Sequence, residues 1–250
     1  MTTSHSGDTT GGGNLAFSLV IPCYNESAGL PELVRRCAYV AAEGGGEIVL
    51  VDNGSTDDSA AVLEGLLGPA GDTAGRDGVR WVRVPVNQGY GFGITSGLAA
   101  ARADIVGWTH ADLQTDPADV LRALPLFEGA GERVLVKGRR FGRPVADRVF
   151  TAGMSTFETA LLRRPLRDIN AQPTLFSREL LDRWGEPPTD FSLDLFALYS
   201  AQELGFEIRR FPVIFAPRKW GSSSWNTDWS AKRRFIRRTL DYSLQLRKSL

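Results

Sequence analysis

The stretch "LVIPCYNES", residues 19–27, changes character half-way along. It begins with the branched apolar residues typical of a buried strand, and at Pro22 it gives way to Tyr24, Asn25 and Glu26. A buried strand has no packing reason to end in polar side chains. Because ligands of open α/β sheets bind outside the carboxyl ends of the strands, this strand end is predicted to meet a ligand.

Short apolar segments alternate with segments of helical period around that stretch. Strands are predicted at residues 17–22, 47–52, 79–84, 104–109 and 133–138, and helices at 31–42, 57–67, 92–101 and 117–126. This order indicates an α/β fold with a mainly parallel sheet and helices on both faces, in one domain over residues 15–229. Beyond it we expect helices at 148–162 and 193–204, a bent strand or strand pair at 206–215, and a separate terminal helix at 230–250.

The composition excludes several classes of protein. Lys plus Arg and Asp plus Glu both total 29, so no overall field would attract nucleic acid. Cys23 and Cys37 lack the spacing of a zinc site or a disulfide framework, which favours the cytoplasm. Residues 1–14 lack the apolar stretch of a signal peptide and are expected to be a disordered leader. No run approaches the roughly 20 apolar residues that span a bilayer, so we expect a soluble or peripheral membrane protein.

The second predicted strand ends in "VDNGSTDDS", residues 51–59. Asp52 leaves the strand at its carboxyl end, where a carboxylate can accept hydrogen bonds from a nucleobase imide or a ribose hydroxyl. Ser55 and Asp57 have a second explanation, since either can cap the helix that follows. Asp52 is therefore the candidate binding residue of this segment.

The segment "NQGYGFGITSGL", residues 87–98, follows the third predicted strand. Its glycines are spaced G-x-G-x-G-x-x-x-G, which departs from the G-x-G-x-x-G of a dinucleotide-binding turn. A glycine-rich turn that opens a helix can still lie close to a nucleotide. Gly89 is accordingly included among the candidate nucleotide-binding residues.

The segment "WTHADLQTDP", residues 108–117, follows the fourth predicted strand. His110, Asp112 and Gln114 alternate, so in an extended backbone their side chains would project the same way. A carboxylate together with an amide oxygen suits a hard divalent cation that keeps positions for diphosphate oxygens. Asp116 is explained by capping of the next helix, but capping leaves Asp112 and Gln114 unexplained.

Four of these segments together, "VIPCYNE", "VDNGSTD", "NQGYGFGITSGL" and "HADLQTDP", resemble the family 2 glycosyltransferases of GT-A fold. The resemblance covers residues 17–226 and is to the subgroup of dolichyl-phosphate mannose synthases and bacterial polyprenyl-phosphate glycosyltransferases. It implies a sugar nucleotide as donor and Mg²⁺ or Mn²⁺, held by Asp112 and Gln114, against the diphosphate. The donor-binding residues are then Pro22, Tyr24, Glu26, Asp52, Gly89 and His110.

The chain departs from the family pattern at three places. The family has an acid where His110 stands, and its second acid after the second strand is Asn53 here. The segment "RDINAQPTLFSREL", residues 167–180, resembles D-x-x-S-G-F-R-x-x-R. Asp168 is retained in it, but Ala171, Gln172 and Pro173 replace S-G-F.

Further matches concern the acceptor and a loop. "GRRF", residues 138–141, resembles G-S-R-Y with Arg140 as the match, while Arg148 and Thr151 resemble a later R-x-x-S. Two arginines that converge on one pocket could hold a lipid phosphate, although arginines are also common on solvated surfaces. "RKWGSSSWN", residues 218–226, resembles R-x-x-G-x-S, a loop that could close over the donor diphosphate through Arg218, Ser223 and Ser224.

The terminal segment, residues 230–250, combines many basic residues with an apolar stripe. Such a helix can lie in a membrane interface and bind an anionic surface. The alternative is that its apolar side packs on the protein's own core. In that case a lipid acceptor would require another tether, such as a membrane protein partner.

Three functions remain open from the sequence. The first is inverting transfer of a hexose to a polyprenyl phosphate, with Asp112, Asp168 and Arg140 as catalytic residues. The second is transfer to a hydroxyl of a saccharide, protein or small molecule, which would need a base such as Asp168 or Asp194. The third is a non-catalytic protein that binds sugar nucleotides.

Overall fold

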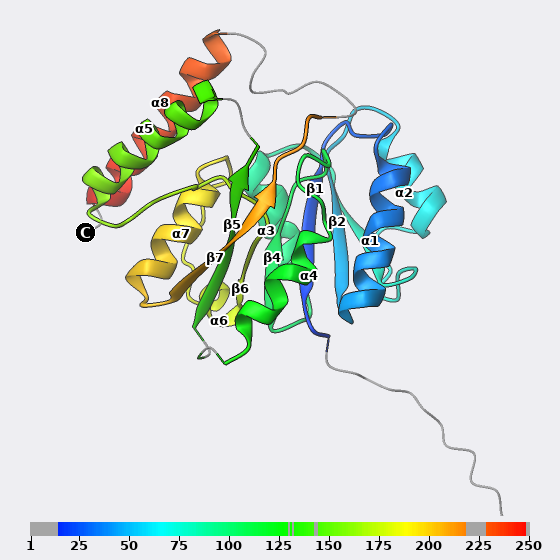
Figure 1. Cartoon of the computed structure of the whole chain (residues 1–250). Helices are drawn as coiled ribbons and strands as arrows, with labels where there is room; N and C mark the ends of the chain where they lie inside the picture. Colours follow the sequence, from blue (N-terminus) through cyan, green and yellow to red (C-terminus); the bar gives the residue numbers. More distant parts are fainter. Residues whose placement is uncertain (1–14, 130, 132, 143–144, 219–228, 249–250) are drawn as a thin grey trace, which may run out of the picture.

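The computed structural model describes residues 15–129, 131, 133–142, 145–218 and 229–248, and its centre is a seven-stranded sheet in the order β3-β2-β1-β4-β6-β5-β7 (Figure 1). The strands are β1 (Ser18–Cys23), β2 (Glu47–Asn53), β3 (Val79–Val84), β4 (Ile105–Trp108), β5 (Val134–Phe141), β6 (Thr174–Ser177) and β7 (Glu207–Ile214). Only β6 among these runs against its neighbours β4 and β5. The other strands therefore have their carboxyl ends at one edge, which confirms the predicted mainly parallel sheet.

Helices cover both faces of the sheet, as predicted (Figure 1). They are α1 (Leu30–Gly44), α2 (Ser59–Leu67), α3 (Tyr90–Ala100), α4 (Asp119–Ala123), α5 (Val145–Leu162), α6 (Arg178–Asp182), α7 (Leu193–Glu203) and α8 (Trp229–Lys248). Along β1, Leu19 and Ile21 belong to the core under α1 and α2, whereas Val20 belongs to the core under α3 and α7. The alternation follows from the two-residue period of a strand.

The glycines of α3 allow this helix to lie directly on the strands. A Cβ on Gly97 would stand 2.3 Å from Val20 Cγ1, and one on Gly93 would stand 2.8 Å from the side-chain amide of Asn53. Side chains at these positions would push the helix off β1 and β2. Close packing of helix on sheet thus accounts for two of the glycines in the segment 87–98.

Four elements of the structure differ from the prediction. The strand β6 and the short helix α6 were not predicted, because β6 is four residues long and shows no readable period. The region 206–215, predicted as a bent strand or strand pair, is the single strand β7. The helix predicted at 117–126 ends as α4 and continues as the 3-10 turn Leu124–Phe127, where Pro125 cannot supply an α-helical amide.

The last helix, α8, lies beside α5 and away from the sheet (Figure 1). Its residues Tyr242 and Leu246 pack against the core under α7, while Leu244 is 48% exposed. Part of the apolar stripe is therefore used for internal packing. Within the ranges the structure describes, no helix has the length and apolar character to cross a membrane.

Candidate active site

Hydrogen bonds join the loops that follow β1 and β2. The amide of Asn25 donates to Ser55 Oγ (3.1 Å), and Asn25 Oδ1 accepts from the amide of Thr56 (2.8 Å). The amide of Glu26 donates to Ser59 Oγ (3.1 Å). Asn25 has a φ of 54°, a left-handed conformation that asparagine tolerates. These contacts hold the polar end of the first strand against that of the second.

Of the two residues expected to cap α2, Asp57 binds the first amide of the helix, although the N-cap residue is Asp58, whose side chain forms no capping hydrogen bond. Asp57 Oδ1 accepts from the amide of Ser59, the first residue of α2, at 3.0 Å, and its Oδ2 accepts from the amide of Ser27 at 3.2 Å. Ser55 contributes to the link between the two loops instead.

Asp52 is fully buried at the end of β2. Its Oδ1 accepts from the amide of Ser55 at 3.0 Å. Its Oδ2 lies 3.5 Å from Arg83 Nε, and no donor among the described residues forms a hydrogen bond with it. Because a buried carboxylate oxygen without a hydrogen bond costs free energy, this oxygen is suited to a ligand that brings a donor.

The chain turns after β4 rather than continuing extended, which corrects the prediction that His110, Asp112 and Gln114 alternate along a strand. Residues 111 and 112 form a turn, and Leu113 has a φ of 54°. Asp112 Oδ1 accepts from the amide of Gln114 at 3.1 Å. The turn thus places the Asp112 carboxylate on the backbone of Gln114, because Asp112 binds the amide two residues on.

Gln114 also connects this turn to the segment after β7. Its Nε2 donates to the carbonyl oxygen of Ala216 at 3.1 Å, and the amide of Ala216 donates to the Gln114 carbonyl at 2.8 Å. With Nε2 used in this way, the amide oxygen of Gln114 is left as the acceptor end of the side chain.

Arg218 follows in the same segment and forms an ion pair and hydrogen bond with Glu26. Burial raises the pKa of Glu26, Arg218 opposes that shift, and the negative charge of Asp112 adds to it. Asp112 also contributes to the raised pKa of Tyr90, which burial causes in the first place. The carboxylate of Asp112 is therefore within electrostatic reach of both side chains.

A buried polar network lies behind this turn. Tyr90 Oη is 3.0 Å from His110 Nε2 and donates to Asp194 Oδ2 at 3.4 Å. Asp194 Oδ1 accepts from Gln172 Nε2 at 2.7 Å and lies 3.5 Å from Lys137 Nζ. Asp194, Gln172 and Lys137 are each at most 2% exposed. Burial lowers the pKa of Lys137 to about 8, although the neighbouring Asp194 acts in the opposite direction.

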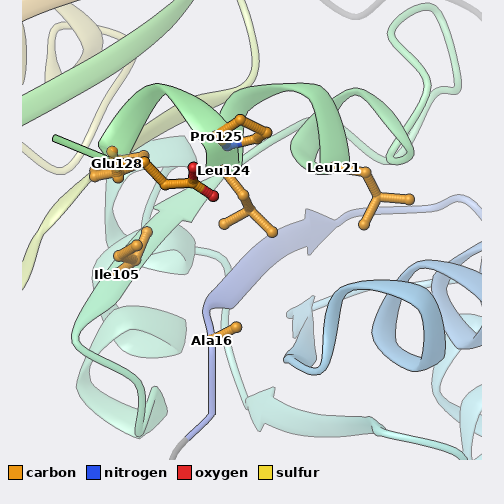
Figure 2. A pocket seen from close by; sticks show the side chains of 7 residues that line it. Ala16, Ile105, Leu121, Leu124, Pro125 and Glu128 are labelled. Carbon is orange, nitrogen blue, oxygen red and sulfur yellow. The ribbon is translucent and has the colours of Figure 1, made fainter.

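The surface depression in Figure 2 lies at the opposite edge of the sheet. Ala16 and Ile105 come from the amino ends of β1 and β4, and the other lining residues are Leu121, Leu124, Pro125, Phe127 and Glu128. One carboxylate among apolar side chains offers no set of groups for catalysis. The polar groups gather instead at the carboxyl ends of the strands.

A family model matches this chain from the start of β1 to beyond β6. Residues 18–185 match the model of glycosyl transferase family 2. The chain belongs to this family. An uncharacterised glycosyltransferase of Mycobacterium bovis is 32% identical over 215 residues, which is 83% of this chain and 88% of that protein.

Other relatives of this family 2 chain have more specific names. An undecaprenyl-phosphate 4-deoxy-4-formamido-L-arabinose transferase of Pseudomonas fluorescens is 43% identical over 111 residues, 42% of this chain. The match spans 30% of that transferase. A transferase of the same name from Klebsiella pneumoniae is 30% identical over 84% of this chain and 62% of its own length.

Solved structures confirm the GT-A fold. Glucosyl-3-phosphoglycerate synthase of Mycobacterium tuberculosis, in complex with phosphoglyceric acid, superposes with a TM-score of 0.70 at 23% identity over 93% of this chain and 80% of that one. A mannosyltransferase of Pyrobaculum calidifontis, in complex with GDP-Man and Mn²⁺, gives a TM-score of 0.64 at 19% identity over 94% of this chain and 65% of that one.

The acceptor-side residues of this family 2 chain are only partly placed. Arg140 lies over the ring of Phe215, 5.8 Å from its centroid, and Asp168 has a φ of 46° in the loop before β6. Thr151 is half-buried on α5. The Arg148 side chain, Ser223 and Ser224 lie outside the described residues, so the expected convergence of Arg140 with Arg148 stays a prediction.

The described residues provide only some of the ligands that a divalent metal ion needs. Among the His, Cys, Asp and Glu side chains of the described ranges, no three are grouped to hold a cation. Asp112 and Gln114 each present one oxygen that their mutual turn and Ala216 leave available. A divalent ion would therefore need the diphosphate of a nucleotide to complete its ligands, as Mg²⁺ commonly does.

The sequence analysis did not identify Tyr90 and Lys137 as candidate site residues, and it considered Asp194 only as a possible general base. Lys137 carries a signal that could have been read, since a lysine stands inside the apolar strand "RVLVKG". Buried lysines are rare unless they are paired, so it called for an acidic partner. Nothing in the local sequence indicated that this partner is Asp194.

Proposed function

We propose that this chain transfers a hexose from a nucleoside diphosphate sugar to a polyprenyl phosphate. The observation that carries the proposal is the fully buried Asp52, whose Oδ2 lacks a hydrogen bond, at the same sheet edge as the Asp112–Gln114 turn. A carboxylate oxygen without a hydrogen bond at the end of β2, and oxygens suited to a cation after β4, with β1 between them, fit a nucleoside joined to a diphosphate. The names of the relatives support undecaprenyl phosphate as the class of acceptor.

The donor lies across the ends of β1, β2 and β4 in this proposal. Asp52 accepts from the base or ribose, with Pro22 and the 43% exposed Tyr24 beside the nucleoside. The ion pair of Arg218 with Glu26 ties the segment after β7 to the loop after β1, and Arg218 opposes the burial that raises the pKa of Glu26. Gly89, Ser223 and Ser224 are further donor-binding residues by resemblance.

Asp112 and Gln114 would hold Mg²⁺ or Mn²⁺. When bound, the ion stabilises the negative charge that develops on the departing diphosphate. Asp112 would supply the carboxylate, and the contact of Gln114 Nε2 with Ala216 leaves the amide oxygen of Gln114 as the acceptor for this role. We expect His110, two residues before Asp112, to complete this part of the donor site.

The acceptor is bound at the ends of β5 and β7 in our proposal. Arg140, Arg148 and Thr151 hold its phosphate, and Asp168 orients the acceptor or the sugar. A phosphate monoester is already ionised at neutral pH, so its oxygen attacks the anomeric carbon with little help from a base. One displacement of this kind inverts the configuration of the sugar.

Contacts of Asp194 disfavour the alternative of a hydroxyl acceptor. Asp194 is 2% exposed and engaged by Lys137, Gln172 and Tyr90, so its carboxylate is not open to take a proton from a substrate hydroxyl. Asp168 would then be the remaining base of the two we considered. This supports a phosphate as the acceptor group.

The proposal is tested with labelled sugar nucleotide, Mn²⁺ and a short-chain polyprenyl phosphate, followed by solvent extraction. We expect label in the organic phase, and none when the lipid carries a free alcohol in place of the phosphate. Label that stays entirely in water-soluble product would reject the lipid acceptor. A donor series of UDP- and GDP-sugars in the same assay identifies the base and the hexose.

Membrane association at the cytoplasmic face is part of the proposal, because a lipid phosphate is reached at the headgroup level. Each basic residue near an anionic surface contributes about 1 kcal/mol, and salt screens the attraction. We expect the protein to co-sediment with anionic vesicles at low salt. Vesicle binding should weaken, and nucleotide binding should stay unchanged, when four arginines of α8 are replaced by Gln: Arg233, Arg234, Arg237 and Arg238.

Neutral vesicles and the Arg35→Gln variant are the controls for this experiment. Arg35 is a surface residue of α1 that pairs with Glu32. If the wild type ignores anionic vesicles at low ionic strength, α8 serves internal packing and the acceptor must be reached through a membrane protein partner.

A further inference from the structure

Two of the three departures from the pattern of the resembled family meet in one buried network. His110 stands where the family has an acid, and Gln172 belongs to the three residues that replace S-G-F. These two residues are 62 positions apart in the sequence. The structure links them through Tyr90 and Asp194, because Tyr90 contacts His110 and Gln172 donates to Asp194.

The hydrogen bonds of the network determine where protons lie. Gln172 and Lys137 both approach Asp194 Oδ1, so Oδ2 depends on the hydroxyl of Tyr90 for its donor. A tyrosine hydroxyl has a single hydrogen. When Tyr90 donates it to Asp194, its oxygen is left to accept, and Nε2 of His110, 3.0 Å away, can supply the donor if it carries the imidazole proton.

Packing keeps Tyr90 in the position that this requires. Its ring stacks on Phe191 at a centroid distance of 4.6 Å and meets the edge of His110 at 5.6 Å with an interplanar angle of 84°. The amide of Phe92, in the first turn of α3, donates to the Thr189 carbonyl at 3.0 Å. The start of α3 is thereby fastened to the loop that precedes α7.

We propose that Asp194, acting through Tyr90, holds His110 with its proton on Nε2, so that Nδ1 offers a lone pair to the divalent cation bound by Asp112. His110 is half-buried, which leaves the ring reachable from the site. A metal-binding histidine commonly donates its other N–H to an outer partner that fixes its tautomer. In this arrangement Tyr90 and Asp194 are positioning residues, and His110 is a nitrogen ligand in place of a carboxylate.

The inference rests on the proposed metal-dependent function and sharpens it. Mg²⁺ prefers oxygen ligands and keeps its waters, whereas Mn²⁺ shares the preference for oxygen but, as a first-row transition ion, accepts an imidazole nitrogen more readily. The site should therefore favour Mn²⁺ over Mg²⁺. Exchange of His110 for Asp should move this preference back toward Mg²⁺.

The chain contains two histidines, which allows a direct test. We would label histidine with ¹⁵N in a His5→Gln variant and record the long-range ¹H–¹⁵N spectrum of the metal-free protein at about pH 8, where an ordinary imidazole is neutral. We expect a protonated Nε2 and an unprotonated Nδ1. A proton on Nδ1 would overturn the proposal, and this readout involves neither metal nor sugar transfer.

The second readout is electron spin-echo modulation of bound Mn²⁺, added alone. Wild type should show coupling to an imidazole nitrogen, and the His110→Gln variant should lose it. The affinity for Mn²⁺ should fall about 10-fold in Tyr90→Phe, the lower end for loss of an outer partner, and stay unchanged in the exposed Tyr39→Phe.

Absence of nitrogen coupling in wild type with Mn²⁺ bound would also overturn the proposal, even if Tyr90→Phe does not fold. Both readouts are independent of turnover. A protein that shows the expected tautomer and nitrogen coupling but transfers no sugar would instead contradict the proposed function.

Discussion

Replacing Asp112 by Asn is expected to lower the rate of sugar transfer by more than about 100-fold. Loss of an outer partner of a metal ligand already costs about 10- to 100-fold, and Asp112 is proposed as a ligand itself. Asparagine keeps an oxygen that can accept from the amide of Gln114, so the turn should persist without its charge. Initial rates at saturating sugar nucleotide, with Mn²⁺ varied, measure the effect.

Asp116→Asn is the matched control because it removes a carboxylate four residues further along. Asp116 pairs with Arg36 at 2.6 Å and accepts from the amide of Ala118, outside the proposed donor site. Its substitution should leave the transfer rate within about twofold, as a surface pair of this kind contributes at most about 1 kcal/mol to stability. Full activity of Asp112→Asn in excess chelator would refute the metal role of Asp112.

Replacing Asp194 by Ala is expected to destabilise the folded protein by about 3–5 kcal/mol, as is typical when one partner of a buried ion pair is removed. Lys137 is fully buried and would lose the carboxylate that lies 3.5 Å from its Nζ. Its remaining partner would be Thr174 Oγ1, at 2.6 Å. Urea unfolding followed by circular dichroism measures the change.

Two further variants separate lost charge pairing from lost packing. The double variant Lys137→Met with Asp194→Leu should recover part of the loss, since an apolar pair has no charge to desolvate. Glu203→Gln removes a carboxylate from the other end of α7, where it pairs with Arg164 at the surface, and should cost less than about 1 kcal/mol. If Asp194→Ala also lowered the free energy of unfolding by less than about 1 kcal/mol, this would contradict the ion pair between Lys137 and Asp194.

Lys137 should also produce a pH dependence of stability. Its pKa is lowered from 10.5 to about 8 in the folded protein, chiefly by burial. Between these values the unfolded chain binds more protons than the folded one, so the Lys137 contribution to the free energy of unfolding rises with pH. This rise in the free energy of unfolding should be absent in Lys137→Met. If both proteins show the same dependence of stability on pH, the pKa of Lys137 is not lowered.

Positions of the strands and helices were predictable because they depend on local periodicity. The strand Val79–Val84 begins and ends where it was predicted, Asp52 lies in the last two residues of β2, and Asp112 follows β4. In a parallel sheet the order of the elements is enough to bring such strand ends to one edge. The polar cluster after Pro22 is accordingly found at that edge.

The backbone between neighbouring motif residues was not predictable in the same way. His110, Asp112 and Gln114 alternate in the sequence, yet the chain turns at Asp112 with Leu113 in a left-handed conformation. The alternating pattern of these residues is compatible with both an extended and a turned backbone. The hydrogen bonds of Gln114 with Ala216, 102 positions away, select the turn.

By itself, the sequence determined which strand ends carry polar residues, because apolar periodicity and turn residues act over a few neighbouring positions. Only the tertiary structure decided that Tyr90 and Asp194, 104 positions apart, share a hydrogen bond behind His110. That contact depends on how closely α3 and α7 dock on the same face of the sheet. Small side chains on α3 and the polar partners available inside the core determine this docking, and both are properties of the folded chain.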